Sequence, residues 1–353
     1  MSGLFLFCRP GFEGECAAEM QDKSAQLGIS GYAKAKPDSG YVVFVTYQVE
    51  DAVTLHERLA FAQLVFSRQW FIVLAMRNDL PVTDRITPIC EALSALPGPA
   101  ADLLLETPDT NEAKELSGLC RSLERPLARA LEQQNLLQRQ GAPDITLHIC
   151  FLSATAAYIG YARSANSARW AMGIPRLKFP PQAPSRSTLK LEEAFLCFLD
   201  ETEREELLHT GMTAVDLGAC PGGWTWQLVR RHLYVTAIDN GPMADSVMDT
   251  GLVTHLRVDG FRYAPEAPVD WMVCDMVEQP IRIADLVARW IERGWCRYTI
   301  FNLKLPMKKR YLEYQRCLAL LDERLRSAGI GYRVRAKQLY HDREEITVFL
   351  ARD

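Results

Sequence analysis

Acidic residues close four apolar runs in the C-terminal half of this 353-residue chain. The four acids are Asp216, Asp239, Asp259 and Asp275, and each run has the length and composition of a buried parallel strand. Surface acids placed at random would not keep this phase with the strands. We therefore expect the carboxylates to line the edge of a sheet at which open α/β folds bind ligands, with Asp239 placed to grip the ribose hydroxyls of a nucleoside.

A turn of small residues follows the first of these runs. It reads Gly218-Ala219-Cys220-Pro221-Gly222-Gly223, and its glycines let the backbone approach a ligand closely. The turn lacks the G-x-G-x-x-G spacing of dinucleotide sites and the Lys and Ser/Thr of a phosphate-binding loop. A ligand with an amino-acid end and an adenosine suits it better, which favours S-adenosylmethionine over NAD or ATP. Taken alone, the three glycines fit an ordinary tight connection equally well.

Lys304 lies within the apolar run 298–306. Lysine is seldom buried without a partner, so this one requires a counter-ion or a function. The next positive charges, Lys308, Lys309 and Arg310, could bind phosphates or simply form a solvated helix start.

Alternating strands and helices must position these residues. In the C-terminal region we expect strands at 214–217, 234–238, 256–258, 271–274 and 298–305, helices at 188–198 and 224–231, and a terminal hairpin of 331–339 and 345–349. The helix at 188–198, which residues 185–187 could cap, would carry Lys190.

The N-terminal half predicts two α+β units without a catalytic constellation. The expected strands are 3–8, 40–47, 69–76, 102–106, 145–152 and 157–163, and the expected helices are 11–27, 51–64, 86–96 and 111–134, the last capped by Asp109 or Thr110 and followed by a turn at 141–143. Four prolines in the segment 173–184 indicate a linker between domains. The expected domains are therefore 1–78, 79–165, a linker at 166–184, and 185–353.

The composition is that of a globular protein, with a net charge of −4 that gives no support for binding nucleic acid over the whole surface. Residues 145–191, however, contain no Asp or Glu. Their cations and aromatic rings could track a phosphate backbone and stack on bases, or could form a solvated linker; they are Arg163, Arg169, Arg176, Lys178, Arg186, Lys190, Tyr158, Tyr161, Trp170 and Phe179. The ten cysteines lack metal-ligand spacing, and no apolar run has membrane-spanning length, so we expect no metal, no membrane and a cytoplasmic location.

Five segments together resemble the FtsJ-type family of RNA ribose 2′-O-methyltransferases: SRSTLKLEEAF, DLGACPGGWT, VCDM, FNLKLP and REEITV. The resemblance implies a Rossmann-like, S-adenosylmethionine-dependent methyltransferase domain. It also implies a catalytic tetrad of Lys190, Asp275, Lys304 and Glu345. The cofactor-binding residues are then expected to be Ser187, Cys220, Pro221, Gly222, Gly223, Asp239, Asp259 and Asp275, with Asp259 on the adenine amine.

Further segments, such as CRPGFEGECAAEM and MGIPRLKFP, extend the likeness over nearly the whole chain to those members of the family that methylate ribosomal RNA. This resemblance implies a ferredoxin-like domain and an RNA-binding THUMP domain ahead of the methyltransferase. It further implies 2′-O-methylation of a cytidine in 23S ribosomal RNA near the peptidyl transferase centre. The substrate is then naked RNA or an early assembly particle, and we expect a monomer. The alternatives are a methyltransferase acting on protein or a metabolite, and an RNA-binding assembly factor that holds S-adenosylmethionine without transferring its methyl.

As general base, Lys304 would have to be neutral when the substrate is bound. Burial and the like charge of Lys190 would lower its pKa, whereas Asp275 and Glu345 would oppose this by favouring the ammonium. The sequence leaves that balance open, and Lys304 could instead orient the hydroxyl.

Overall fold

The computed structural model describes residues 3–141 and 144–353, and the chain divides into two compact units between Pro175 and Arg176. The division falls within the expected linker 166–184, which contains the short 3-10 turn Ala171–Gly173; another such turn, Ser164–Asn166, ends at its first residue. The predicted turn at 141–143 lies partly outside the described residues. None of the helices in the described ranges is both long and apolar enough to span a bilayer.

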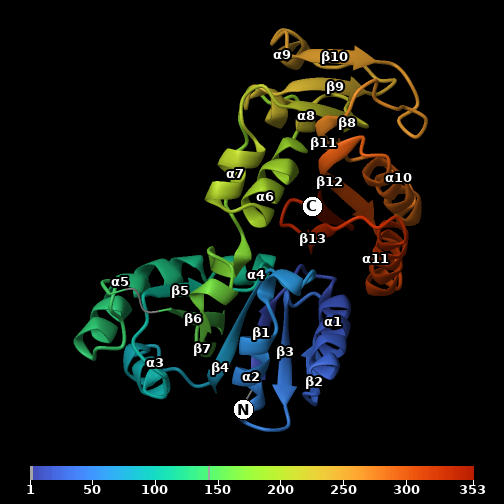
Figure 1. Cartoon of the computed structure of the whole chain (residues 1–353). Coiled ribbons are helices and arrows are strands. Elements are labelled where there is room, and N and C mark those ends of the chain that lie inside the picture. Colours follow the sequence, from blue (N-terminus) through green and yellow to red (C-terminus); the bar gives the residue numbers. More distant parts are fainter. Residues whose placement is uncertain (1–2, 142–143) are drawn as a thin grey trace. The chain divides into compact units, whose positions relative to one another are not determined.

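The first unit is built on a seven-stranded sheet of order β2-β3-β1-β4-β7-β6-β5 (Figure 1). All neighbours are antiparallel except β5 and β6. Its elements are β1 (Gly3–Phe7), α1 (Glu13–Gln26), β2 (Gly31–Ala35), β3 (Tyr41–Thr46), α2 (Asp51–Arg58), β4 (Gln69–Arg77), α3 (Ile86–Leu93), β5 (Asp102–Glu106), α4 (Asn111–Lys114), α5 (Ser117–Gln133), β6 (Ile145–Ser153) and β7 (Ala156–Arg163). Because β4 pairs with β7, the sheet continues across the expected boundary at 78/79. The subdivision of this unit into two domains stays a prediction.

Several expectations for this unit need correction, among them the helix expected at 51–64, which ends at Arg58. The helix expected at 111–134 is two helices, and the Thr110 hydroxyl caps the first by accepting the Ala113 amide at 3.2 Å, as predicted. Tyr158 and Tyr161 do not form a stacking surface for bases. Tyr161 is buried, and the Tyr158 ring packs 5.0 Å from the Phe5 ring, because successive β7 side chains enter opposite faces of a covered sheet.

The second unit has a sheet of order β10-β9-β8-β11-β12-β14-β13. The first five strands are parallel, and β14 and β13 form an antiparallel hairpin at one side. The elements are α6 (Thr188–Phe198), α7 (Glu201–Leu207), β8 (Thr213–Leu217), α8 (Gly223–Val229), β9 (Tyr234–Ile238), α9 (Asp245–Met248), β10 (Val253–Leu256), β11 (Val269–Cys274), α10 (Pro280–Glu292), β12 (Cys296–Lys304), α11 (Arg310–Ser327), β13 (Tyr332–Lys337) and β14 (Glu345–Arg352). The strand order reverses between β8 and β11, and such a switch point is where Rossmann-like sheets bind ligands.

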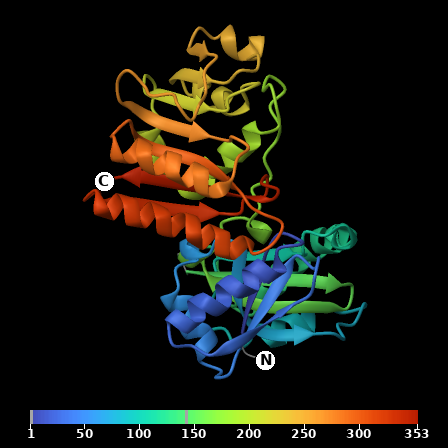
Figure 2. The ribbon, with the colours of Figure 1, turned by 90° about the vertical axis from the view of Figure 1, so that its right-hand side faces the viewer.

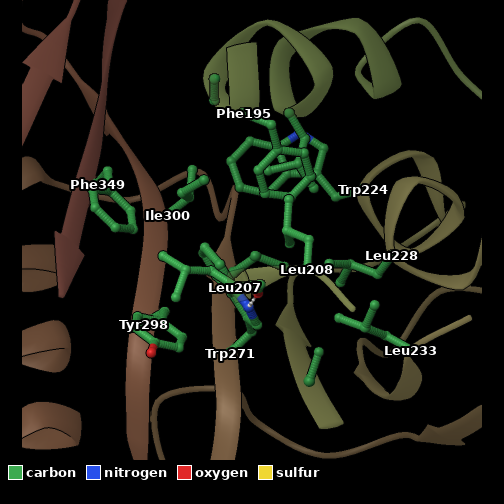
Figure 3. Packing of buried hydrophobic residues seen from close by; sticks show 14 of the residues in the cluster. Phe195, Leu207, Leu208, Trp224, Leu228, Leu233, Trp271, Tyr298, Ile300 and Phe349 are labelled. Atoms are coloured by element: carbon green, nitrogen blue, oxygen red, sulfur yellow. Dashed lines mark hydrogen bonds between the residues drawn. The ribbon is translucent and has the colours of Figure 1, made fainter. Parts of the chain in front are cut away.

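Helices cover both faces of this second sheet. Figure 2 shows α10 and α11 lying together along one face, and Figure 1 shows α6 and α8 on the other. Beneath α6 and α8, the rings of Phe195 and Trp224 gather with Trp271 of β11 (Figure 3). Trp271 is fully buried, and its indole donates a hydrogen bond to the Leu207 carbonyl at 2.5 Å. This core fixes β11, and with it Asp275, against the helix that carries Lys190.

Candidate active site

Four charged side chains from four elements meet at the carboxyl edge of the second sheet. They are Lys190 of α6, Asp275 directly after β11, Lys304 at the end of β12, and Glu345 at the start of β14. Lys304 forms ion pairs with both Asp275 and Glu345. Lys190 pairs with Glu345 and lies 3.4 Å from Asp275 Oδ2. The structure thus brings together the four residues that the sequence resemblance singled out, as two lysines alternating with two carboxylates.

Strand register explains how residues so distant in sequence converge. Cys274 pairs with Phe301, and in the antiparallel ladder Lys304 lies directly opposite Glu345. Lys190 is fixed by its helix, because the buried Glu193 one turn along accepts the Tyr340 and His341 amides at 2.7 and 2.9 Å. Those amides belong to the β13–β14 turn, so α6 is tied to the hairpin that supplies Glu345.

Charge balance within the cluster determines the protonation of Lys304. Burial lowers its pKa, but the Asp275 and Glu345 carboxylates raise it by more, so the pKa of Lys304 lies above its ordinary value. The opposing influences considered from the sequence therefore resolve in favour of the ammonium. In the protein by itself Lys304 is a cation.

The glycine turn between β8 and α8 leaves little room for side chains. Gly218 and Gly222 have φ values of 79° and 113°, which favour glycine, and the Cys220–Pro221 peptide is cis. A Cβ on Gly218 would lie 2.7 Å from Met276, and a Cβ on Gly223 would lie 2.1 Å from Ser187 Oγ. The turn is therefore a cradle of backbone without side chains, closely bounded by neighbouring segments.

Asp239 holds two sides of this cradle together. Its Oδ2 accepts the Cys220 amide at 2.9 Å, and its Oδ1 accepts the Gly241 amide at 2.8 Å. The carboxylate is half-buried and retains lone pairs that a diol could use. Its position directly after β9 agrees with the position expected from the sequence.

Asp216 and Asp259, the other two acids expected to follow a strand directly, do not lie at a strand end. Asp216 is inside β8 and 1% exposed, with Oδ2 accepting the Thr225 hydroxyl at 2.6 Å. Burial raises the pKa of Asp216 to about 7. Asp259 lies three residues beyond the end of β10, which is Val253–Leu256 and not 256–258 as expected. Its exposed carboxylate is 3.5 Å from Arg262. The apolar Val258 extended the predicted strand too far, although it is itself exposed.

Ser187 does not cap α6 through its side chain, contrary to expectation. Its hydroxyl lies 2.6 Å from that of Ser185, and both oxygens face Gly223. Met276 borders the candidate site and was not predicted from the sequence. It packs between the positions where Cβ atoms on Gly218 and Gly260 would stand, and only the folded loops reveal this.

Residues 183–307 match the family of FtsJ-like methyltransferases, so the second unit is a methyltransferase with a Rossmann-like fold, as expected. Residues 1–71 match the RlmM ferredoxin-like domain, and residues 84–163 match the N-terminal domain of ribosomal RNA large subunit methyltransferase M.

Relatives match over the full length. Proteins named ribosomal RNA large subunit methyltransferase M are 54% identical in Edwardsiella ictaluri (100% of this chain, 94% of that protein) and 54% identical in Methylococcus capsulatus (99% and 98%). The protein of that name in Pasteurella multocida is 52% identical (99% of both chains). The chain belongs to the family of ribosomal RNA large subunit methyltransferase M.

Proposed function

We propose that this methyltransferase transfers a methyl group to the ribose 2′-oxygen of a cytidine in 23S ribosomal RNA. S-adenosylmethionine is the methyl donor. The observation that carries the choice of a hydroxyl acceptor is the tetrad of Lys190, Asp275, Lys304 and Glu345 beside the glycine turn. The name of the relatives supports ribosomal RNA as substrate, and the sequence resemblance supports the cytidine.

The glycine cradle fits the donor. Gly218, Gly222 and Gly223 carry no side chains, so the backbone of this turn can come close to a ligand on its open side, while Met276, Val247 and Ser187 fill the places of the missing Cβ atoms. We assign the ribose diol to Asp239 and the methionine end to the backbone of 220–223, with Ser187 beside it. We also assign the adenine amine to Asp259. To bind it, the exposed Asp259 carboxylate must give up its ion pair with Arg262.

Lys304 takes the proton of the 2′-hydroxyl in this proposal. S-adenosylmethionine supplies an electrophilic methyl on a sulfonium, so the chain must mainly align and deprotonate the acceptor oxygen. Alignment near 3 Å can lower the barrier by roughly 7 to 11 kcal/mol. The positive sulfonium, bound beside Lys304, would lower the pKa of Lys304 and so offset the rise caused by the Asp275 and Glu345 carboxylates. Asp275 and Glu345 orient the lysine, and Lys190 neutralises the excess negative charge.

RNA binding would use local cations, because the chain as a whole is acidic. In the second unit Arg176, Lys178 and Arg186 are exposed, and so are Lys308 and Lys309 just beyond Lys304. Val277 and Met307 are each 91% exposed and follow Asp275 and Lys304 closely. Exposed apolar side chains beside a phosphate-binding cluster suit the face of an unpaired base.

The test is methyl transfer from labelled S-adenosylmethionine to ribosomal RNA isolated from a strain lacking the protein. Digestion to nucleosides should yield labelled 2′-O-methylcytidine. Lys304→Met should abolish transfer and retain donor binding. Lys304→Arg should also abolish it, because an arginine keeps the charge but does not release its proton.

Lys23→Met, on α1 of the other unit, is the matched control and should transfer at the wild-type rate. Label on a base, or undiminished transfer by Lys304→Met, would overturn the proposal.

A further inference from the structure

Three buried side chains lie in a row behind the tetrad. Asn302 Nδ2 donates to Asp275 Oδ1 at 2.9 Å, and Thr347 Oγ1 lies 2.8 Å from Asn302 Oδ1. The same Thr347 oxygen lies 3.1 and 2.9 Å from the two carboxyl oxygens of Asp342. Asn302 and Thr347 are fully buried, and Asp342 is 1% exposed.

The row belongs to the same ladder as the tetrad. Asn302 pairs with Thr347 across β12 and β14, two residues from the pair formed by Lys304 and Glu345. Residues two apart on a strand share a face, so the row continues the line of tetrad side chains into the interior. Asp342 comes from the turn that precedes β14.

Donor and acceptor counting sets the direction of every bond in the row. Asp275 accepts from the ammonium groups of two lysines, and Asn302 presents its amide NH₂ to the same carboxyl group. The Asn302 oxygen then faces Thr347 and takes its single hydroxyl proton.

Thr347 now has only lone pairs to offer Asp342. Two acceptors within 3.1 Å would repel each other, so Asp342 must supply a proton. Asp342 Oδ2 also accepts the Leu339 amide at 3.0 Å, which favours Oδ1 as the protonated oxygen.

The surroundings of Asp342 favour this neutral acid. Burial raises the pKa of Asp342 well above its ordinary value, and the nearby carboxylates of Glu345 and Glu193 raise it further. The Leu339 amide and Lys190 act in the opposite direction and are the weaker influences.

We propose that neutral Asp342, Thr347 and Asn302 are positioning residues for methyl transfer, a one-directional hydrogen-bond chain that holds Asp275 and so aims Lys304. The inference rests on the proposed function for its reaction. None of the three touches the reacting atoms. The chain restricts Asp275 to the rotamer in which Oδ1 receives both Asn302 and Lys304. Losing this restraint should misplace Lys304 without removing any group that binds RNA or the methyl donor.

Isosteric variants of the full-length protein test the proposal in the methyl-transfer assay. Thr347→Val removes the hydroxyl and should lower kcat about tenfold or more, with KM for RNA and for S-adenosylmethionine within about twofold of wild type. Thr347→Ser restores the hydroxyl and should restore most of kcat. Asp342→Asn presents a permanent donor to Thr347 and should likewise keep most of it, whereas Asp342→Ala should behave as Thr347→Val.

Thr299→Val is the matched control, since Thr299 is also a fully buried threonine of this sheet and its hydroxyl lies 3.6 Å from Met272 sulfur. It should keep the wild-type kcat. Wild-type kcat in Thr347→Val would overturn the proposal. So would a loss in Asp342→Asn as large as that in Thr347→Val, because an ionised Asp342 would then be required.

A second measurement does not depend on the reaction. The carboxyl carbon-13 resonance of Asp342, assigned by its loss in Asp342→Asn, should at pH 7 have the shift of a protonated acid. The shift of a carboxylate would overturn the chain. If the wild-type protein labelled no RNA, the proposed function would fail, and this spectrum would still decide the protonation of Asp342.

Discussion

Gly223→Ala should damage the enzyme through a steric contact that can be located in advance. A methyl group at this position would lie 2.1 Å from Ser187 Oγ, 2.3 Å from Ser185 Oγ and 3.2 Å from the Thr188 amide nitrogen. Ordinary contacts to the two hydroxyl oxygens are more than 1 Å longer, so both serine side chains must rotate away from each other's hydrogen bond, or α8 or the segment 185–188 must move. Overpacking of this kind costs about 1 to 3 kcal/mol of unfolding free energy, which is a fall in Tm of roughly 2 to 12 °C.

The displacement should also reach the tetrad. The Lys190 amide donates to the Ser187 carbonyl at 3.0 Å, so a shift of Ser187 moves the first turn of α6 and its lysine. A misplacement near 1 Å can cost about a hundredfold in rate, and we expect kcat of Gly223→Ala to fall by at least tenfold. Donor affinity, measured by calorimetry, should fall as well, because Gly223 is part of the cradle.

The refuting result comes from a double-mutant cycle. Replacing Ser185 and Ser187 together by alanine removes both oxygens that the new methyl group meets. In that background Gly223→Ala should cost much less, with a coupling energy of about 1 kcal/mol or more in unfolding and a partial recovery of kcat. Additive effects would show that the contact with these hydroxyls is not the cause.

Four further outcomes follow from the same geometry. Because Asp275 and Glu345 raise the pKa of Lys304, kcat should rise with pH between about 7 and 9 if Lys304 must be neutral; a flat profile would argue against its role as base. Burial raises the pKa of Asp216 to about 7, so between pH 4 and 7 the native state binds a proton that the unfolded state does not. The unfolding free energy, measured by denaturant titration, should therefore fall over this pH range more in the wild type than in Asp216→Asn. An equal dependence of the unfolding free energy on pH in the two proteins would contradict this. Trp271→Phe, which loses the bond to the Leu207 carbonyl and leaves a void, should cost about 1 to 3 kcal/mol in the same titration. Met307→Ser should raise KM for RNA about fivefold and leave donor binding unchanged, and an unchanged KM would remove Met307 from the RNA surface.

Local pattern predicted most elements, and its failures have physical causes. The strands of the second sheet were predictable because parallel strands buried on both faces are nearly continuous apolar runs, as at β8 and β11. β10 was displaced in the prediction because Leu256 and Val258 are apolar yet exposed, and composition does not distinguish such residues from buried ones. β2 was missed because it is an edge strand with alternating small and polar residues.

The site shows the same division between local and non-local information. Lys304 stood out as a lysine in an apolar run, and the resemblance supplied its three partners. Asn302, two residues earlier in that run, carried no signal, because its function depends on being opposite Thr347 across the ladder. Contacts set by the register of strands about 45 residues apart are invisible to periodicity within either strand.

Two structural links connect the glycine cradle, our proposed donor site, to the tetrad, and they act on different members of it. The contact of Gly223 with Ser187 reaches Lys190 through the first turn of α6. The packing of Met276 against Gly218 reaches Asp275, its neighbour in the chain. A side chain added at either glycine therefore pushes on one lysine or one carboxylate of the same cluster. Since these four charges hold one another, we expect a side chain added at either glycine to disturb both the cradle and the aim of Lys304.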